Sequence, residues 1–180
     1  MAKRLFLIGV FLLAVLGSAG LVVLVPNPLG AEIIQEAKAM GYIAFTPEEA
    51  TVLAYERCSA CHTEDKMLKY CTRCGPPFIV VTHTMRKYID ITNAQNKDLN
   101  IEQFTDAEIV AITQAWNALI GNWENDWPKK DIRKLLDGDA ALIRLLDTPV
   151  KNRPIEAALK GKSAPGVYQR YGIGTNDNPS

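Results

Sequence analysis

A run of 21 residues without a charged side chain, residues 5–25, constrains this 180-residue chain more than any other feature. As a helix, the run would be roughly 30 Å long, which matches the hydrocarbon thickness of a bilayer. The basic segment before it, Met1-Ala2-Lys3-Arg4, should remain cytoplasmic, which places the rest of the chain on the extracytoplasmic or periplasmic side. We therefore expect residues 1–25 to form an uncleaved, single-pass transmembrane anchor.

A cleaved signal peptide is the alternative for this segment. Residues 5–16 could serve as its apolar core, and Gly17-Ser18-Ala19 is a passable cleavage site. The apolar run continues beyond these small residues to Val25, whereas the core of a signal peptide is usually shorter, and this favours the anchor. In either case, residues 26–180 are expected in an oxidising compartment.

The rest of the chain carries helix signals and no convincing run of alternating residues that would indicate strands. Residues 26–44 are expected to be a linker. Thr46 with Glu49, and Thr105 with Glu108, have the spacing of a capping box, which marks the start of a helix. The fold class is therefore predicted to be all-α. The expected helices are residues 46–57, 78–90, 105–120, 128–136, 139–146 and 154–160.

The chemistry of the chain is concentrated in Cys58-Ser59-Ala60-Cys61-His62, directly after the first of these helices. C-x-x-C-H is the attachment signature of c-type haem. The two thiols add to the vinyl groups of the haem, and the histidine binds the iron as the proximal ligand. The chain has only two histidines, His62 and His83. We expect one covalently bound haem c, held by Cys58, Cys61 and His62.

A second C-x-x-C pair, Cys71 and Cys74, raises the alternative of a zinc site built from four cysteines. Zinc would require four thiolates in an oxidising compartment and would leave His62 unexplained. The sequence around the second pair, CTRCG, lacks the histidine of a haem signature. We expect Cys71 and Cys74 to form a disulfide, with free thiols, metal binding or a redox role as the alternatives.

Three segments together resemble a class I c-type cytochrome: YERCSACH at residues 55–62, a later helix that contains a methionine, and FTDAEIVAITQAW at residues 104–116. The resemblance covers about residues 45–120, so residues 45–121 are expected to be the haem domain. It implies electron transfer, a single low-spin haem and a distal iron ligand that is usually methionine. The second cysteine pair departs from the family pattern.

The candidates for the distal ligand are Met85, His83, Met67 and Met40. In the expected helix 78–90, Met85 lies on an apolar stripe with Phe78, Val81 and Tyr88. His83 lies about 200° around the helix from Met85, on a stripe with Ile79, Arg86 and Asp90 that should meet water. Only one of the two can face the iron. We expect Met85 to be the distal ligand, with His83 as the alternative.

The expected function is electron transfer by a subunit of a respiratory or photosynthetic complex, and not catalysis. The formal net charge of zero gives no argument for a nucleic-acid partner. Two other classes stay open. One is a zinc-binding structural or assembly module, and the other is a haem enzyme or sensor with an open distal site.

Residues 122–180 are expected to form a C-terminal extension that docks on a partner subunit, with a tail that has no partner as the alternative. Residues 26–125 hold eight basic and thirteen acidic side chains, a net charge of −5, whereas residues 126–180 hold ten basic and seven acidic ones, a net charge of +3. The extension also contains Tyr168, Arg170 and Tyr171, residue types that are common at interfaces. Other electron-transfer subunits or carriers are the expected partners.

Overall fold

The structure is a computed structural model that describes residues 28–61, 63, 75–96 and 98–161. These residues form α-helices and two short 3-10 helices, and none of them forms a strand, which confirms the all-α prediction. Within the described residues, no helix is long and apolar enough to cross a membrane. The expected anchor, residues 1–25, lies outside them.

The helices lie close to their expected positions. Helix α5 extends five residues beyond the expected end at Asp90, and α2 lies within the expected linker 26–44. The elements are α2 (Pro28–Ala39), α3 (Pro47–Ser59), α5 (Phe78–Gln95), α6 (Asp106–Ile120), η1 (Glu124–Asp126), α7 (Lys129–Leu135), α8 (Ala140–Asp147), η2 (Val150–Asn152) and α9 (Pro154–Leu159).

The chain divides into two compact units, Met1–Ala37 and Lys38–Ser180. The described part of the first unit is helix α2 as far as Ala37, and its Ile33 and Ile34 are exposed to solvent. The second unit contains the remaining helices and the candidate site described below.

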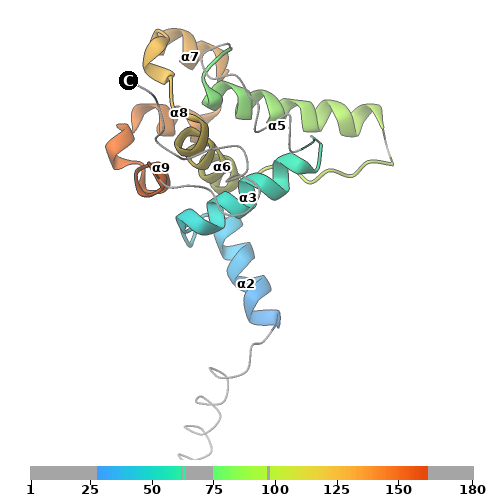
Figure 1. Cartoon of the computed structure of the whole chain (residues 1–180). Coiled ribbons are helices and arrows are strands. Elements are labelled where there is room, and N and C mark those ends of the chain that lie inside the picture. The colour runs from blue at the N-terminus through green and yellow to red at the C-terminus, as the bar shows by residue number, and fades with distance from the viewer. Residues whose placement is uncertain (1–27, 62, 64–74, 97, 162–180) are drawn as a thin grey trace, which may run out of the picture. The chain divides into compact units, whose positions relative to one another are not determined.

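Helix α6 is the central element of the second unit, and it contacts α3, α5, α8 and α9 (Figure 1). Its buried residues lie on nearly every side of the helix, from Ile109 through Thr113 and Trp116 to Leu119. A helix whose side chains are buried on nearly every side belongs in a core. Both predicted capping boxes are present, at Thr46 with Glu49 and at Thr105 with Glu108, so the starts of α3 and α6 are fixed by local sequence.

Residues 122–161 are part of this core, although we expected a separate extension to begin at residue 122. Leu142, Leu145 and Leu159 belong to the same buried apolar cluster as Ile109 on α6. The apolar residues of this region are spread over several short helices, so no single long apolar stripe marks it in the sequence. The packing therefore has no boundary at Gly121.

A buried ionic cluster also joins this region to α6. Arg153 binds Glu124 (Nη2 to Oε2, 2.7 Å) and Glu156 (Nη1 to Oε2, 3.1 Å), and all three side chains are at most 7% exposed. Asn117 of α6 donates to Glu124 Oε1 at 3.1 Å. Buried charges are tolerated when they are paired and hydrogen-bonded, as they are here.

Candidate functional site

A cavity of about 410 Å³ lies between α3, α5, α6 and the segment of residues 101–104. Its size is within the usual range for sites that bind small molecules and cofactors. The described residues that line it are mainly apolar, and they include Phe78, Val81, Ile89, Ile109, Ile112 and Trp116. The cavity therefore suits a ligand with a large apolar surface.

Cys58 and Cys61 both line this cavity. Cys58 is in the last turn of α3 and is partly buried, whereas Cys61 follows the helix and is exposed. Burial raises the pKa of the Cys58 thiol to about 11, and the nearby Cys61 adds to this, while the Trp116 indole and Arg57 act in the opposite direction. Cys58 is therefore a neutral thiol at physiological pH. His62, the third residue of the motif, lies outside the described residues.

Met85 lines the same cavity, together with the three other members of its predicted stripe, Phe78, Val81 and Tyr88. The predicted phase of helix α5 is therefore confirmed. The structure thus brings together three of the predicted site residues. They are Cys58 in the last turn of α3, Cys61 just after that helix, and Met85 on α5.

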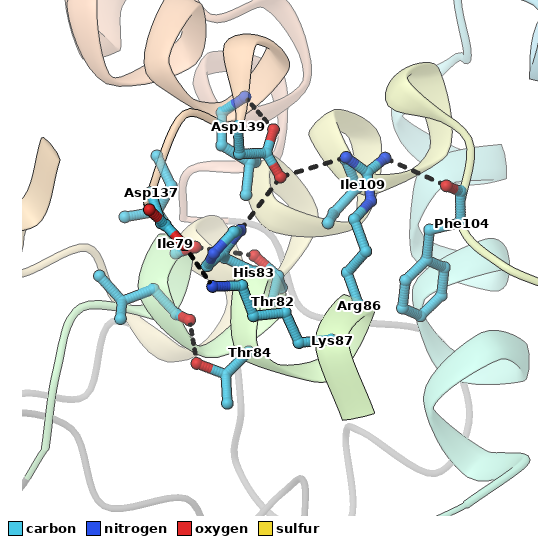
Figure 2. A network of polar contacts seen from close by, with 12 residues as sticks. Ile79, Thr82, His83, Thr84, Arg86, Lys87, Phe104, Ile109, Asp137 and Asp139 are labelled. Atoms are coloured by element: carbon cyan, nitrogen blue, oxygen red, sulfur yellow. Dashed lines mark hydrogen bonds and ion pairs between the residues drawn. The ribbon is translucent and has the colours of Figure 1, made fainter. Parts of the chain in front are cut away.

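His83 does not line the cavity, and it does not meet water as we expected. It is 6% exposed, and Ile79 on the same stripe is fully buried. Its Nδ1 atom is 3.1 Å from Oδ2 of Asp139, the residue that caps helix α8 (Figure 2). The expectation was wrong because it treated residues after 121 as separate, whereas this region covers that side of α5.

Arg57 is a site residue that the sequence analysis missed. Its guanidinium donates to the backbone carbonyls of Glu102 (2.9 Å) and Gln103 (3.0 Å) and lies 5.0 Å from the ring centroid of Phe104. It therefore ties the last turn of α3 to the segment that forms one wall of the cavity. The only sequence signal was a basic residue in a last helical turn, which is common in proteins.

The side chain of Asn93 on α5 fixes the other side of this wall. Its amide donates to the Ile101 carbonyl (2.8 Å) and accepts from the Ile101 amide (3.0 Å). Gln103 donates to the backbone carbonyl of Arg86 (3.0 Å) and to Asp90 (2.8 Å). Residues 101–104 are thus held to both α3 and α5.

Of the remaining predicted site residues, the structure describes Met40. Met40 is 60% exposed and does not line it. Cys71, Cys74 and Met67 lie outside the described residues, as His62 does, so the expected disulfide and the zinc alternative stay predictions. In the part of the chain that the structure describes, no cluster of three or more histidine, cysteine or acidic residues could hold a metal ion.

The arrangement fits the cofactor that the motif predicts. A haem needs an apolar enclosure, two thiols on one side and donor atoms for the iron. The cavity offers the enclosure and both thiols, and Met85 offers a thioether sulfur.

The chain matches no family model, and the comparisons with curated proteins and with solved structures also found no match.

Proposed function

We propose that this chain is a membrane-anchored electron carrier with one covalently bound haem c. The observation that carries the proposal is that Cys58, Cys61 and Met85 line one apolar cavity. Cys58 and Cys61 would hold the haem through two thioether bonds. His62 would be the proximal ligand and Met85 the distal ligand. When bound, haem c supplies a centre that accepts and releases one electron.

The chain's own residues would control the environment of that centre. Trp116, Phe78 and Ile112 give the cavity apolar walls, and such walls would raise the reduction potential because they disfavour the more highly charged oxidised iron. A thioether ligand raises the potential relative to a second imidazole. Met85 at the cavity and His83 on another side of α5 therefore support a carrier of relatively high potential.

The described walls of the cavity carry few charged groups, which suits an electron carrier. Among the described lining residues, the ionic side chains are Arg57 and Glu102, and these two pair with each other (Nη1 to Oε2, 3.4 Å). General acid–base catalysis needs a carboxylate, imidazole or similar group that is positioned to exchange a proton with substrate. A haem enzyme or sensor with an open distal site would also require Met85 to leave the iron accessible.

The partners of the carrier are proposed from the sequence. The anchor at residues 1–25 would confine the chain to the membrane and so raise its effective concentration near other subunits. We propose that it belongs to a respiratory or photosynthetic electron-transfer complex on the periplasmic side. Because residues 122–161 are engaged in the core, docking on a partner would involve their outer surface or residues 162–180.

The test compares the two cysteine pairs in the full-length chain, produced in cells that mature c-type cytochromes. In Cys58→Ala/Cys61→Ala, covalent haem should be lost. The matched control Cys71→Ala/Cys74→Ala has the same number of thiols removed, and it should keep a reduced low-spin haem spectrum that survives acid–acetone extraction.

The outcome separates the function classes. If both double variants lose a bound metal and neither absorbs visible light, the chain is a four-cysteine zinc module. If Cys58→Ala/Cys61→Ala retains an unchanged covalent haem spectrum, the proposed attachment site is wrong. A covalent haem of high-spin type in the unmodified chain would instead support the enzyme or sensor.

A further inference from the structure

The carboxylate of Asp139 lies at the centre of a polar network between α8 and α5 (Figure 2). Its side chain is 4% exposed. Oδ1 accepts a hydrogen bond from the Leu142 amide (3.1 Å) and so caps α8. Oδ2 accepts from Arg86 Nη1 (3.1 Å) and lies 3.1 Å from His83 Nδ1. One side chain of the C-terminal region therefore holds two residues of α5.

Asp139 is a carboxylate anion in this network. Burial raises its pKa, but the Leu142 amide, His83 and Arg86 outweigh burial, and the net pKa lies below the ordinary value. An ionised carboxylate only accepts hydrogen bonds, so Nδ1 of His83 is the donor. Lys87 and Asp137, which bind each other at 3.0 Å, are two further charged groups beside this network.

Arg86 extends the network to the start of α6. Its Nη2 atom donates to the Phe104 carbonyl and to Asp106 Oδ1, both at 3.1 Å. Helix α5 is thus tied to α8 at His83 and to both α8 and α6 at Arg86. These two residues are within one helical turn of Met85, and they lie on other sides of the helix from it.

This geometry fixes the rotation of α5 about its own axis at the turn that carries Met85. A rotation that moved Met85 away from the cavity would also pull His83 and Arg86 away from Asp139. The broken contacts would leave a buried carboxylate with fewer partners, which is costly. The backbone hydrogen bonds of α5 alone do not resist such a rotation.

We propose that Asp139 is a positioning residue that holds Met85 toward the cavity through His83 and Arg86. The inference rests on the proposed function, in which Met85 binds the haem iron. It gives the C-terminal region a role in ligation, because a residue 54 positions after Met85 would set how firmly the sulfur stays in place.

The experiment replaces Asp139 in the full-length, haem-loaded chain. Asp139→Asn removes the charge but keeps an N-cap residue of similar strength, so α8 should stay capped. The matched control is Asp147→Asn at the other end of α8, where the carboxylate pairs with Lys129 and Arg133 of α7. The measurement is a titration toward high pH. Its midpoint is the pH at which the oxidised protein has lost half of its near-infrared sulfur-to-iron band. Met85→Leu supplies the baseline without that band.

We expect this midpoint to fall by about one pH unit in Asp139→Asn, a roughly tenfold weaker hold on the ligand. Asp147→Asn should match the unmodified chain. Arg86→Lys keeps the charge but loses the forked geometry, and it should give a smaller shift in the same direction. Arg86→Lys is also the variant to measure if Asp139→Asn fails to fold.

Urea unfolding of each variant separates positioning from stability. If the free energy of unfolding falls while the midpoint stays at that of the unmodified chain, the network is merely structural and the inference is overturned. A chain whose unmodified form lacks the band, or lacks covalent haem, contradicts the proposed function itself. A shifted midpoint in Asp139→Asn with an unchanged midpoint in Asp147→Asn supports the inference.

Discussion

Cys58 and Cys61 are three residues apart in sequence, but their thiols have different surroundings. Cys58 is partly buried beside Trp116 at the end of α3, and its pKa is about 11, whereas Cys61 is exposed. Burial disfavours the thiolate because a charged sulfur loses its hydration there. The thiolate is the reactive form of cysteine, so the two thiols should react at different rates.

In reduced, haem-free protein we expect iodoacetamide to modify Cys61 faster than Cys58. At pH 8 a thiol with a pKa of about 11 is ionised in roughly one molecule in a thousand, so Cys58 should react roughly a hundredfold more slowly than an unperturbed, accessible cysteine. The rate at Cys58 should rise with pH until about 11. Mass spectrometry of the separate peptides over time measures both rates. Equal rates at pH 8 would contradict the burial of Cys58.

At the scale of elements, the short helices after α6 are held by polar contacts as much as by apolar ones. Ile155 at the start of α9 donates its amide to Gln114 of α6 (3.2 Å). Arg153, directly before α9, bonds through all three guanidinium nitrogens, to Glu124, Glu156 and the Thr148 carbonyl. A six-residue helix is too short to be stable by itself, so these contacts fix its position.

Arg153→Met should lower the free energy of unfolding by about 3–5 kcal/mol, because it leaves two buried carboxylates without a cation. Methionine keeps an unbranched apolar chain in place of the arginine stem, so the loss of packing is small. The control is Arg133→Met, which removes an exposed ion pair to Asp147 and should leave stability nearly unchanged. Urea denaturation measures both. Similar values for the two variants would mean that the buried cluster adds no more than a surface pair.

At the scale of the molecule, the described part of residues 38–161 behaves as one packed unit. Helix α6 contacts helices on both sides of it in the sequence, α3 and α5 before and α8 and α9 after. The cavity is lined by α3, α5 and α6. Asp139 binds α5 through Arg86, which does not line the cavity. The candidate site therefore depends on residues that we expected to lie in a separate extension.

Truncation tests this dependence. A chain that ends at Gly121 should lose its cooperative unfolding transition, because it lacks Leu142, Leu145 and Leu159 of the core and exposes apolar residues of α6. A chain that ends at Gly161 keeps every described contact and should unfold with nearly the same midpoint as the full chain. Circular dichroism during heating measures both. Cooperative unfolding of the shorter chain would restore a domain boundary at residue 121.

The features that could be predicted are those set by local sequence. The capping boxes of Thr46 and Thr105 are local patterns, and the apolar stripe that contains Met85 depends only on helical spacing. The burial of His83 could not be predicted in this way, because its partner Asp139 is 56 residues later in the chain. Arg57 was missed for the same reason, since it binds backbone carbonyls 45 and 46 residues away.

The braced wall at residues 101–104 bears on how such a protein is made. Arg57 of α3 and Asn93 of α5 form hydrogen bonds with this wall, and Trp116 lies beside Cys58. These contacts join protein groups to one another, so the wall does not need a cofactor to hold it in place. If a cofactor is joined covalently to Cys58 and Cys61, the chain that receives it would already present one finished wall of the cavity.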